Sequence, residues 1–128
     1  MTMFDNDSHQ STSRQRGLLT EAFAAQYLMA NGLLLIDKNF HCRQGEIDLI
    51  MREGQTFVFV EVKYRKNNHF GGAMAAVSAA KQQKIKHCVK FYLHKLGLNE
   101  YNTACRCDVI ALTGNIEKPD VNWLRNAF

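Results

Sequence analysis

The chain has 128 residues, which is enough for one domain with a buried core. Its composition, 46% hydrophobic and 22% charged, is that of a globular protein and excludes disorder over most of the chain. The sequence has neither an apolar run near the roughly 20 residues of a membrane span nor a secretory signal pattern, so we expect a cytoplasmic protein without a membrane partner. Residues 14–128 carry 16 basic and 10 acidic side chains, a balance of +6 that fits a polyanionic partner such as nucleic acid.

Periodicity and turn signals divide the chain into a polar tail, residues 1–13, and one α/β domain, residues 14–128. The predicted elements are, in order, helix 14–31, strands 33–40, 46–51 and 56–64, helix 74–96, and strands 104–112 and 121–124. Ser13 is the expected N-cap of the first helix, and Gly32 and Gly97 are expected to end the two helices. The order αβββαββ predicts a central mixed β-sheet flanked by helices.

The sequence contains four cysteines but no Cys-x-x-Cys pair of the kind that structural zinc sites use. The cysteines are Cys42, Cys88, Cys105 and Cys107. A Cys/His cluster that includes His41 and His87 is an open alternative. We expect reduced thiols that act as small core residues.

Acidic residues interrupt two strongly apolar strands, in Gly45-Glu46-Ile47-Asp48-Leu49-Ile50 and in Phe57-Val58-Phe59-Val60-Glu61-Val62-Lys63. A buried carboxylate must face a compensating charge, or its pKa must rise. An even-numbered loop around residues 53–54 pairs Asp48 with Phe59 and Glu46 with Glu61, which places Asp48, Glu61 and Lys63 on one sheet face. An odd-numbered loop would turn Asp48 to the other face.

Each predicted helix also carries a charged residue toward its apolar side. Glu21 lies between Ala25 and Leu28 on the helical projection, and Lys81 lies within the apolar stripe of the second helix, which includes Met74. The alternatives are a solvated helix edge for Glu21 and a lysine head that extends to water for Lys81.

Two neighbouring carboxylates repel each other unless a divalent cation lies between them. Oxygen ligands suit Mg²⁺ or Mn²⁺, so we expect Asp48, Glu61 and the Val62 backbone carbonyl to bind one of these metals. Glu21 would either ligate the metal through water or tune the site. Lys63 would orient the attacking water and stabilise charge on a phosphoryl group.

Basic residues next to this set are candidates for contacts with nucleic-acid phosphates. Arg65 continues the Lys63 face, Lys66 follows in the loop, and Lys81 would approach from the second helix. Farther along, Arg106 and Asp108 share a strand face and predict a structural ion pair. Trp123 is expected in the core or at an interface, with base stacking as the weaker alternative.

Together these residues resemble the PD-(D/E)xK nuclease motif, in which Asp48 is followed by Glu61-Val62-Lys63 on an αβββαβ core. Glu21 is similar in position to the helix glutamate of Holliday-junction-resolvase-like branches. More narrowly, residues 14–128 resemble the YraN family of small bacterial endonuclease-like proteins. The matching stretches are Gly17 with Glu21, residues 45–50, residues 59–65, Phe70-Gly71, Lys81, Cys105-Arg106-x-Asp108-Val109-Ile110 and Asn126-Ala127-Phe128. The departures are Thr20, where the family usually has glycine, and Cys107, where an aromatic residue is common.

The resemblance implies a restriction-endonuclease-like fold and metal-dependent hydrolysis of DNA phosphodiester bonds, with branched repair or recombination intermediates among the candidate substrates. The catalytic residues would be Glu21, Asp48, Glu61 and Lys63. Resolvases of similar shape act as dimers, so a homodimer is an open expectation. Proteins on this fold can lose activity, so the alternative is an inactive nucleic-acid-binding or adaptor module. A third interpretation is a structural protein whose charged hairpin only forms salt bridges.

Overall fold

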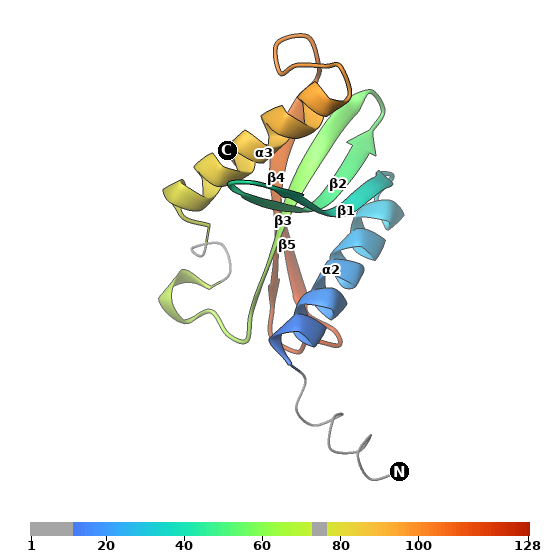
Figure 1. Ribbon diagram of the computed structural model, residues 1–128. Helices are drawn as coiled ribbons and strands as arrows, with labels where there is room; N and C mark the ends of the chain where they lie inside the picture. The colour runs from blue at the N-terminus through green and yellow to red at the C-terminus, as the bar shows by residue number, and fades with distance from the viewer. Residues whose placement is uncertain (1–11, 73–76) are drawn as a thin grey trace, which may run out of the picture.

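The computed structural model of the protein describes residues 12–72 and 77–128 (Figure 1). Its elements are α2 (Ser13–Ala30), β1 (Leu34–Cys42), β2 (Gly45–Glu53), β3 (Thr56–Arg65), the 3-10 turn η1 (His69–Gly71), α3 (Ala79–Lys95), β4 (Cys105–Thr113) and β5 (Asp120–Leu124). Among these residues the order of helices and strands is the predicted αβββαββ, so the mixed α/β class with a restriction-endonuclease-like core is confirmed.

The described strands form one five-stranded sheet in the order β1-β2-β3-β4-β5. The neighbours β3 and β4 are parallel, and every other neighbouring pair is antiparallel. The parallel step requires a crossover connection, which α3 provides. Figure 1 shows α2 and α3 on opposite sides of the sheet.

Alternation along β3 explains why both faces of the sheet are covered. Val58 and Val60 pack with Leu28 of α2, whereas Phe59 packs with Ile85 and other residues of α3. All five side chains are at most 2% exposed. A strand with apolar residues on both faces therefore needs a helix layer on each side, as in other α/β folds.

The helix starts differ from the prediction. The N-cap of α2 is Thr12 rather than Ser13, because the Thr12 side chain accepts from Gln15 N–H while the Gln15 side chain accepts from Thr12 N–H. The second helix begins at Ala79, capped by the Ser78 hydroxyl, and the predicted start at residue 74 lies outside the described residues. The predicted tail likewise falls almost entirely outside them.

The hairpin register is displaced by two residues from the prediction. Glu53 pairs with Thr56, and Ile50 rather than Asp48 pairs with Phe59. The loop is therefore the two-residue Gly54-Gln55 connection, in which Gly54 has a positive φ of 59°. Because the displacement is even, it preserves which face each side chain occupies.

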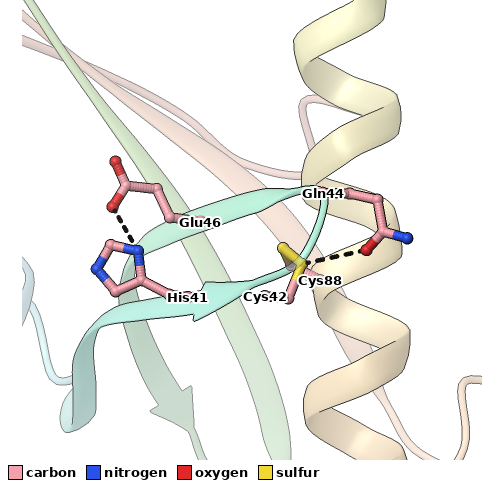
Figure 2. The surroundings of a disulfide bond; sticks show 5 residues. All are labelled: His41, Cys42, Gln44, Glu46 and Cys88. Carbon is pink, nitrogen blue, oxygen red and sulfur yellow. Dashed lines mark hydrogen bonds and ion pairs between the residues drawn. A yellow bond between two sulfur atoms is a disulfide. The ribbon is translucent and has the colours of Figure 1, made fainter.

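The expectation of four reduced cysteines is wrong for one pair. Cys42 and Cys88 form a disulfide whose Cα atoms lie 5.6 Å apart (Figure 2). The β1–β2 turn lies directly against α3, so closely that a Cβ added to Gly45 would lie 3.3 Å from the Lys84 Cβ. Cys105 and Cys107 are free thiols. The Cys/His cluster is not found, because no group of three potential metal-binding side chains converges among the described residues.

Candidate active site

Asp48 of β2 and Glu61 of β3 lie next to each other on the sheet face that α3 covers. The β2–β3 ladder ends at the pair of Leu49 and Val60, and just beyond it Asp48 lies close enough to Glu61 for their charges to interact. The two acidic residues are only 8% and 2% exposed. The structure thus brings two acidic groups, distant along the chain, into one buried position.

The backbone of β3 orients Asp48. The Val62 N–H donates a 2.9 Å hydrogen bond to Asp48 Oδ2, at the point where the paired β2–β3 ladder ends. The N–H and C=O of one residue in an antiparallel ladder face the same neighbouring strand. The Val62 carbonyl is therefore directed to the same side of β3 as Asp48.

Glu61 has one satisfied oxygen and one unsatisfied oxygen. Its Oε2 lies 3.3 Å from Lys63 Nζ and 3.5 Å from Lys81 Nζ. Its Oε1 is buried and has no hydrogen-bond partner among the described residues. An unpaired buried carboxylate oxygen is costly, so this atom marks a position where a cation would be stabilised.

The mutual repulsion of the two acidic groups is large. Burial, together with the negative charge of Glu61, raises the pKa of Asp48 to about 8. The Val62 N–H opposes that rise, because it stabilises the ionised form. Without a cation the two carboxyl groups accommodate each other by holding a proton, and a divalent cation at the same place would take over this role.

Glu21 lies on α2 near the edge of this set without joining it. Burial raises its pKa, a hydrogen bond with Asn39 opposes the rise, and the charges of Glu46 and Glu61 add to it. Glu21 lines a cleft with Asn39, His41 and Glu46, and His41 Nδ1 lies 3.5 Å from Glu46 Oε2 (Figure 2). No described trio of His, Cys, Asp or Glu residues is close enough to hold a metal directly, so Glu21 does not complete a three-carboxylate site.

The residues expected to contact phosphate occupy different environments. Arg65 is exposed at the end of β3, where its Nη1 donates to the Tyr64 carbonyl, and Lys66 is exposed in the following loop. Lys81 lies in the first turn of α3 and is half-buried against Glu61. Lys63 and Lys81 thus bring two positive charges to one carboxylate oxygen.

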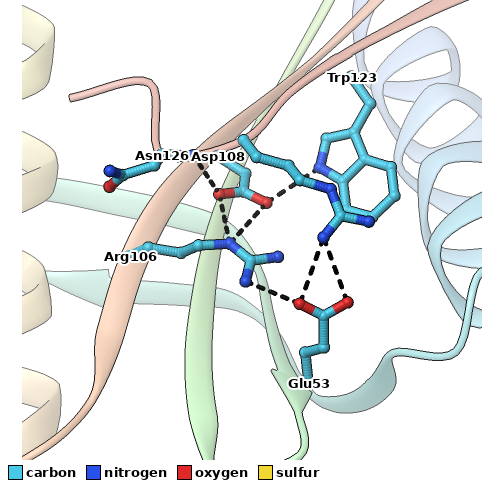
Figure 3. A network of polar contacts seen from close by, with 6 residues as sticks. Glu53, Arg106, Asp108, Trp123 and Asn126 are labelled. Carbon is cyan, nitrogen blue, oxygen red and sulfur yellow. Dashed lines mark hydrogen bonds and ion pairs between the residues drawn. The ribbon is translucent and has the colours of Figure 1, made fainter.

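A second polar network, on the opposite face of the sheet, stabilises the fold (Figure 3). Asp108 is fully buried and accepts hydrogen bonds from Arg106 Nε, Trp123 Nε1 and the Asn126 N–H. Arg106 also pairs with Glu53 Oε1 at 2.8 Å. The predicted Arg106–Asp108 ion pair is confirmed, and Trp123 packs against the α2-side core.

The sequence analysis missed the other members of this network. Glu53, Arg125 and the Asn126 backbone join it only because the ends of β2, β4 and β5 meet in space. No local pattern indicates a contact across such a separation along the chain.

Fold and site define an α/β protein whose central sheet carries a buried carboxylate pair flanked by two lysines. Residues 20–112 match the model of the family described as "Uncharacterised protein family UPF0102", and the chain belongs to this family. It is 63% identical to the UPF0102 protein of Colwellia psychrerythraea, with 92% of each chain covered. It is 47% identical to that of Chromohalobacter salexigens, over 91% of this chain and 92% of the relative. UPF0102 and YraN denote one family, so the family resemblance is confirmed.

Among the helices that the structure describes, none is long and apolar enough to cross a bilayer.

Proposed function

We propose that the protein is a Mg²⁺- or Mn²⁺-dependent nuclease of the PD-(D/E)xK superfamily that hydrolyses phosphodiester bonds in DNA. The observation that carries this proposal is the neighbouring, buried Asp48 and Glu61 pair, in which Glu61 Oε1 has no hydrogen-bond partner among the described residues. Apolar residues would stabilise this position better than two carboxylates do, unless a cation binds there.

The residues present fit a hard divalent cation. Asp48 and Glu61 would supply carboxylate oxygens, the Val62 carbonyl would supply a neutral oxygen, and water would complete the coordination. When bound, the metal would lower the pKa of a ligated water and polarise a phosphoryl oxygen. Glu21, which lies farther away, would act through a water molecule.

The two lysines would stabilise negative charge at the carboxylate pair and on the phosphoryl group. Lys63 Nζ, at 3.3 Å from Glu61, is placed to hold the attacking water and to stabilise negative charge that develops on the phosphoryl group. Lys81 reduces the net charge of the carboxylate pair and approaches from α3, where a backbone phosphate would also lie. Arg65 and Lys66 are exposed and free to position the flanking phosphates.

The basic charge of the chain indicates the class of substrate, and the analogy with resolvases indicates where and in which assembly the protein would act. The basic balance of residues 14–128 favours DNA as the partner. We include branched repair or recombination intermediates, action in the cytoplasm and a homodimer in the proposal, by analogy with resolvases of similar shape.

One observation favours a second candidate function, an inactive nucleic-acid-binding module on the same fold. Among the described residues the carboxylate pair has no third direct protein ligand of the His, Cys, Asp or Glu type. Such a module would bind DNA without a divalent metal, and binding would persist in Glu61→Ala.

Cleavage assays separate the two functions. Labelled duplex, single-stranded and four-way DNA are incubated with Mg²⁺ or Mn²⁺ and the wild type, Asp48→Asn or Glu61→Gln. Glu46→Gln is the matched control, because it removes a carboxylate of the same strand whose side chain is 39% exposed. The nuclease proposal predicts metal-dependent cleavage that Glu46→Gln retains and the other two variants lose. Equal background cleavage by the wild type and Asp48→Asn contradicts catalysis at this site.

A further inference from the structure

A polar pocket lies one strand away from Lys63. Lys63 pairs in register with Ala111 of β4, and Ala111 pairs with Asn122 of β5. Register partners on neighbouring strands share a sheet face, and adjacent strands are about 4.8 Å apart. The row that begins at the catalytic lysine therefore continues across the sheet to Asn122.

The loop after β3 closes over this row. A pocket of about 260 Å³ is lined by Asn68 and Gly71 of that loop and by Ala111, Thr113, Asp120, Val121 and Asn122 of the sheet. We call this pocket the nucleoside subsite. Ala111 is 3% exposed and forms its floor, and its small side chain leaves the space open.

The chemistry of the lining indicates the ligand. Among the described residues that line the subsite there is no lysine, arginine or aromatic side chain. The Asp120 carboxylate would repel a phosphate, so phosphate is not the group that enters. Two asparagine amides, a threonine hydroxyl and a carboxylate match the donors and acceptors on the edge of a nucleobase and on a sugar.

The position of the pocket relative to Lys63 also favours a nucleoside as the ligand. Asn122 lies two strand steps from Lys63, which is about 10 Å, and Ala111 lies between them. A nucleoside attached to a phosphate at Lys63 would extend across Ala111 toward Asn122. A base that is paired inside a duplex cannot enter a pocket, whereas an unpaired or extruded base can.

From these observations we propose that the subsite binds the unpaired nucleoside attached to the scissile phosphate, and that Asp120 favours a base with an exocyclic amine. This inference rests on the proposed nuclease function and specifies its substrate: a strand that is unpaired next to the cleaved bond. Cytosine, whose N4 amine can donate to a carboxylate, would be preferred over thymine, which has only a carbonyl there.

Binding is tested in EDTA, so that cleavage does not interfere. The fluorescence anisotropy of labelled oligocytidine, oligothymidine and duplex DNA is titrated with the wild type, Asp120→Asn and Asn122→Ala. Glu117→Gln is the matched control, because Glu117 is exposed in the β4–β5 connection outside the subsite. Asp120 and Asn122 are both exposed, so their substitution leaves the core intact.

The inference predicts that the wild type binds oligocytidine more tightly than oligothymidine. Asn122→Ala should weaken single-strand binding about tenfold, as loss of a base contact does, and leave duplex binding within about twofold. Asp120→Asn should abolish the preference for cytosine, and Glu117→Gln should keep it.

Failure of this inference is distinguishable from failure of the proposed function. Metal-dependent cleavage together with an unchanged base preference in Asp120→Asn overturns the subsite and leaves the nuclease intact. Absence of cleavage together with an Asp120-dependent preference supports the subsite and overturns the nuclease. Equal binding of both oligonucleotides by the wild type, or no binding at all, overturns the subsite.

Discussion

Reduction of the Cys42–Cys88 disulfide should lower the free energy of unfolding substantially. The bond closes a loop across a sequence separation of 46 residues. The chain-entropy relation gives about 4 kcal/mol of stabilisation at 25 °C for a loop of this length, since the cross-link restricts the unfolded chain. The loop contains β2, β3 and α3 up to Cys88, so it includes the carboxylate pair and both of its lysines.

The measurement is urea denaturation followed by circular dichroism, with and without a phosphine reductant. With a urea dependence of about 2 kcal/mol per molar, the midpoint should fall by about 2 M on reduction. Intact mass under each condition establishes whether the disulfide is present. The double variant Cys42→Ala/Cys88→Ala is the control, because its midpoint should not respond to the reductant.

The reasoning is refuted if the wild type is oxidised by mass and yet unfolds at the same urea concentration after reduction. It is also refuted if the reductant shifts the double variant as much as the wild type. In either case the cross-link would not stabilise the fold by restricting the unfolded chain.

Three further predictions concern charged groups. Because folding raises the pKa of Asp48 to about 8, the contribution of Asp48 to the stability of the metal-free protein should be complete below about pH 4 and decline as the pH rises through about 8. Asp48→Asn should flatten the decline of the urea midpoint in EDTA between about pH 6 and pH 8. Asp108→Ala should lower the free energy of unfolding by about 3–5 kcal/mol, because it breaks the buried Arg106–Asp108 ion pair and removes the acceptor of Trp123 Nε1 and of the Asn126 N–H, although Arg106 keeps its contact with Glu53. Denaturation followed by tryptophan fluorescence checks this, and a loss under about 1 kcal/mol contradicts it. Lys81→Met should raise the affinity for Mn²⁺ in calorimetry, because Glu61 loses a competing positive charge, and it should lower the affinity for DNA at low salt, because one basic side chain is removed. Unchanged affinities for both ligands would show that the charge of Lys81 affects neither.

Local patterns were sufficient to predict the layers of the fold. The apolar run through Phe59 and Val60 required cover on both sheet faces, and α2 and α3 provide it. The alternation of side chains along each strand also predicted that Asp48 and Glu61 share a face, because the relative faces of paired strands depend only on whether the number of loop residues is even. The resemblance of these motifs to the YraN family then agreed with the family match.

Features that depend on tertiary contacts could not be predicted in the same way. A four-residue loop and a two-residue loop between β2 and β3 keep the side chains on the same faces but differ by two residues in register. Only the turn geometry at Gly54 distinguishes them. Cys42 and Cys88 carry no local signal of their pairing, since it arises from the packing of a turn on a helix. The distance of Glu21 from the carboxylate pair likewise depends on how α2 sits against β1.

The proposed nuclease chemistry requires that Asp48 and Glu61 bind one divalent cation together. Isothermal titration of the metal-free protein with Mn²⁺ near pH 8 tests this most directly, because about half of the Asp48 carboxyl groups are then ionised before the metal binds. The wild type and Glu46→Gln should each bind one ion, and Asp48→Asn and Glu61→Gln should lose the site. Binding of the same strength in Asp48→Asn and the wild type, or no binding in the wild type, would contradict the claim.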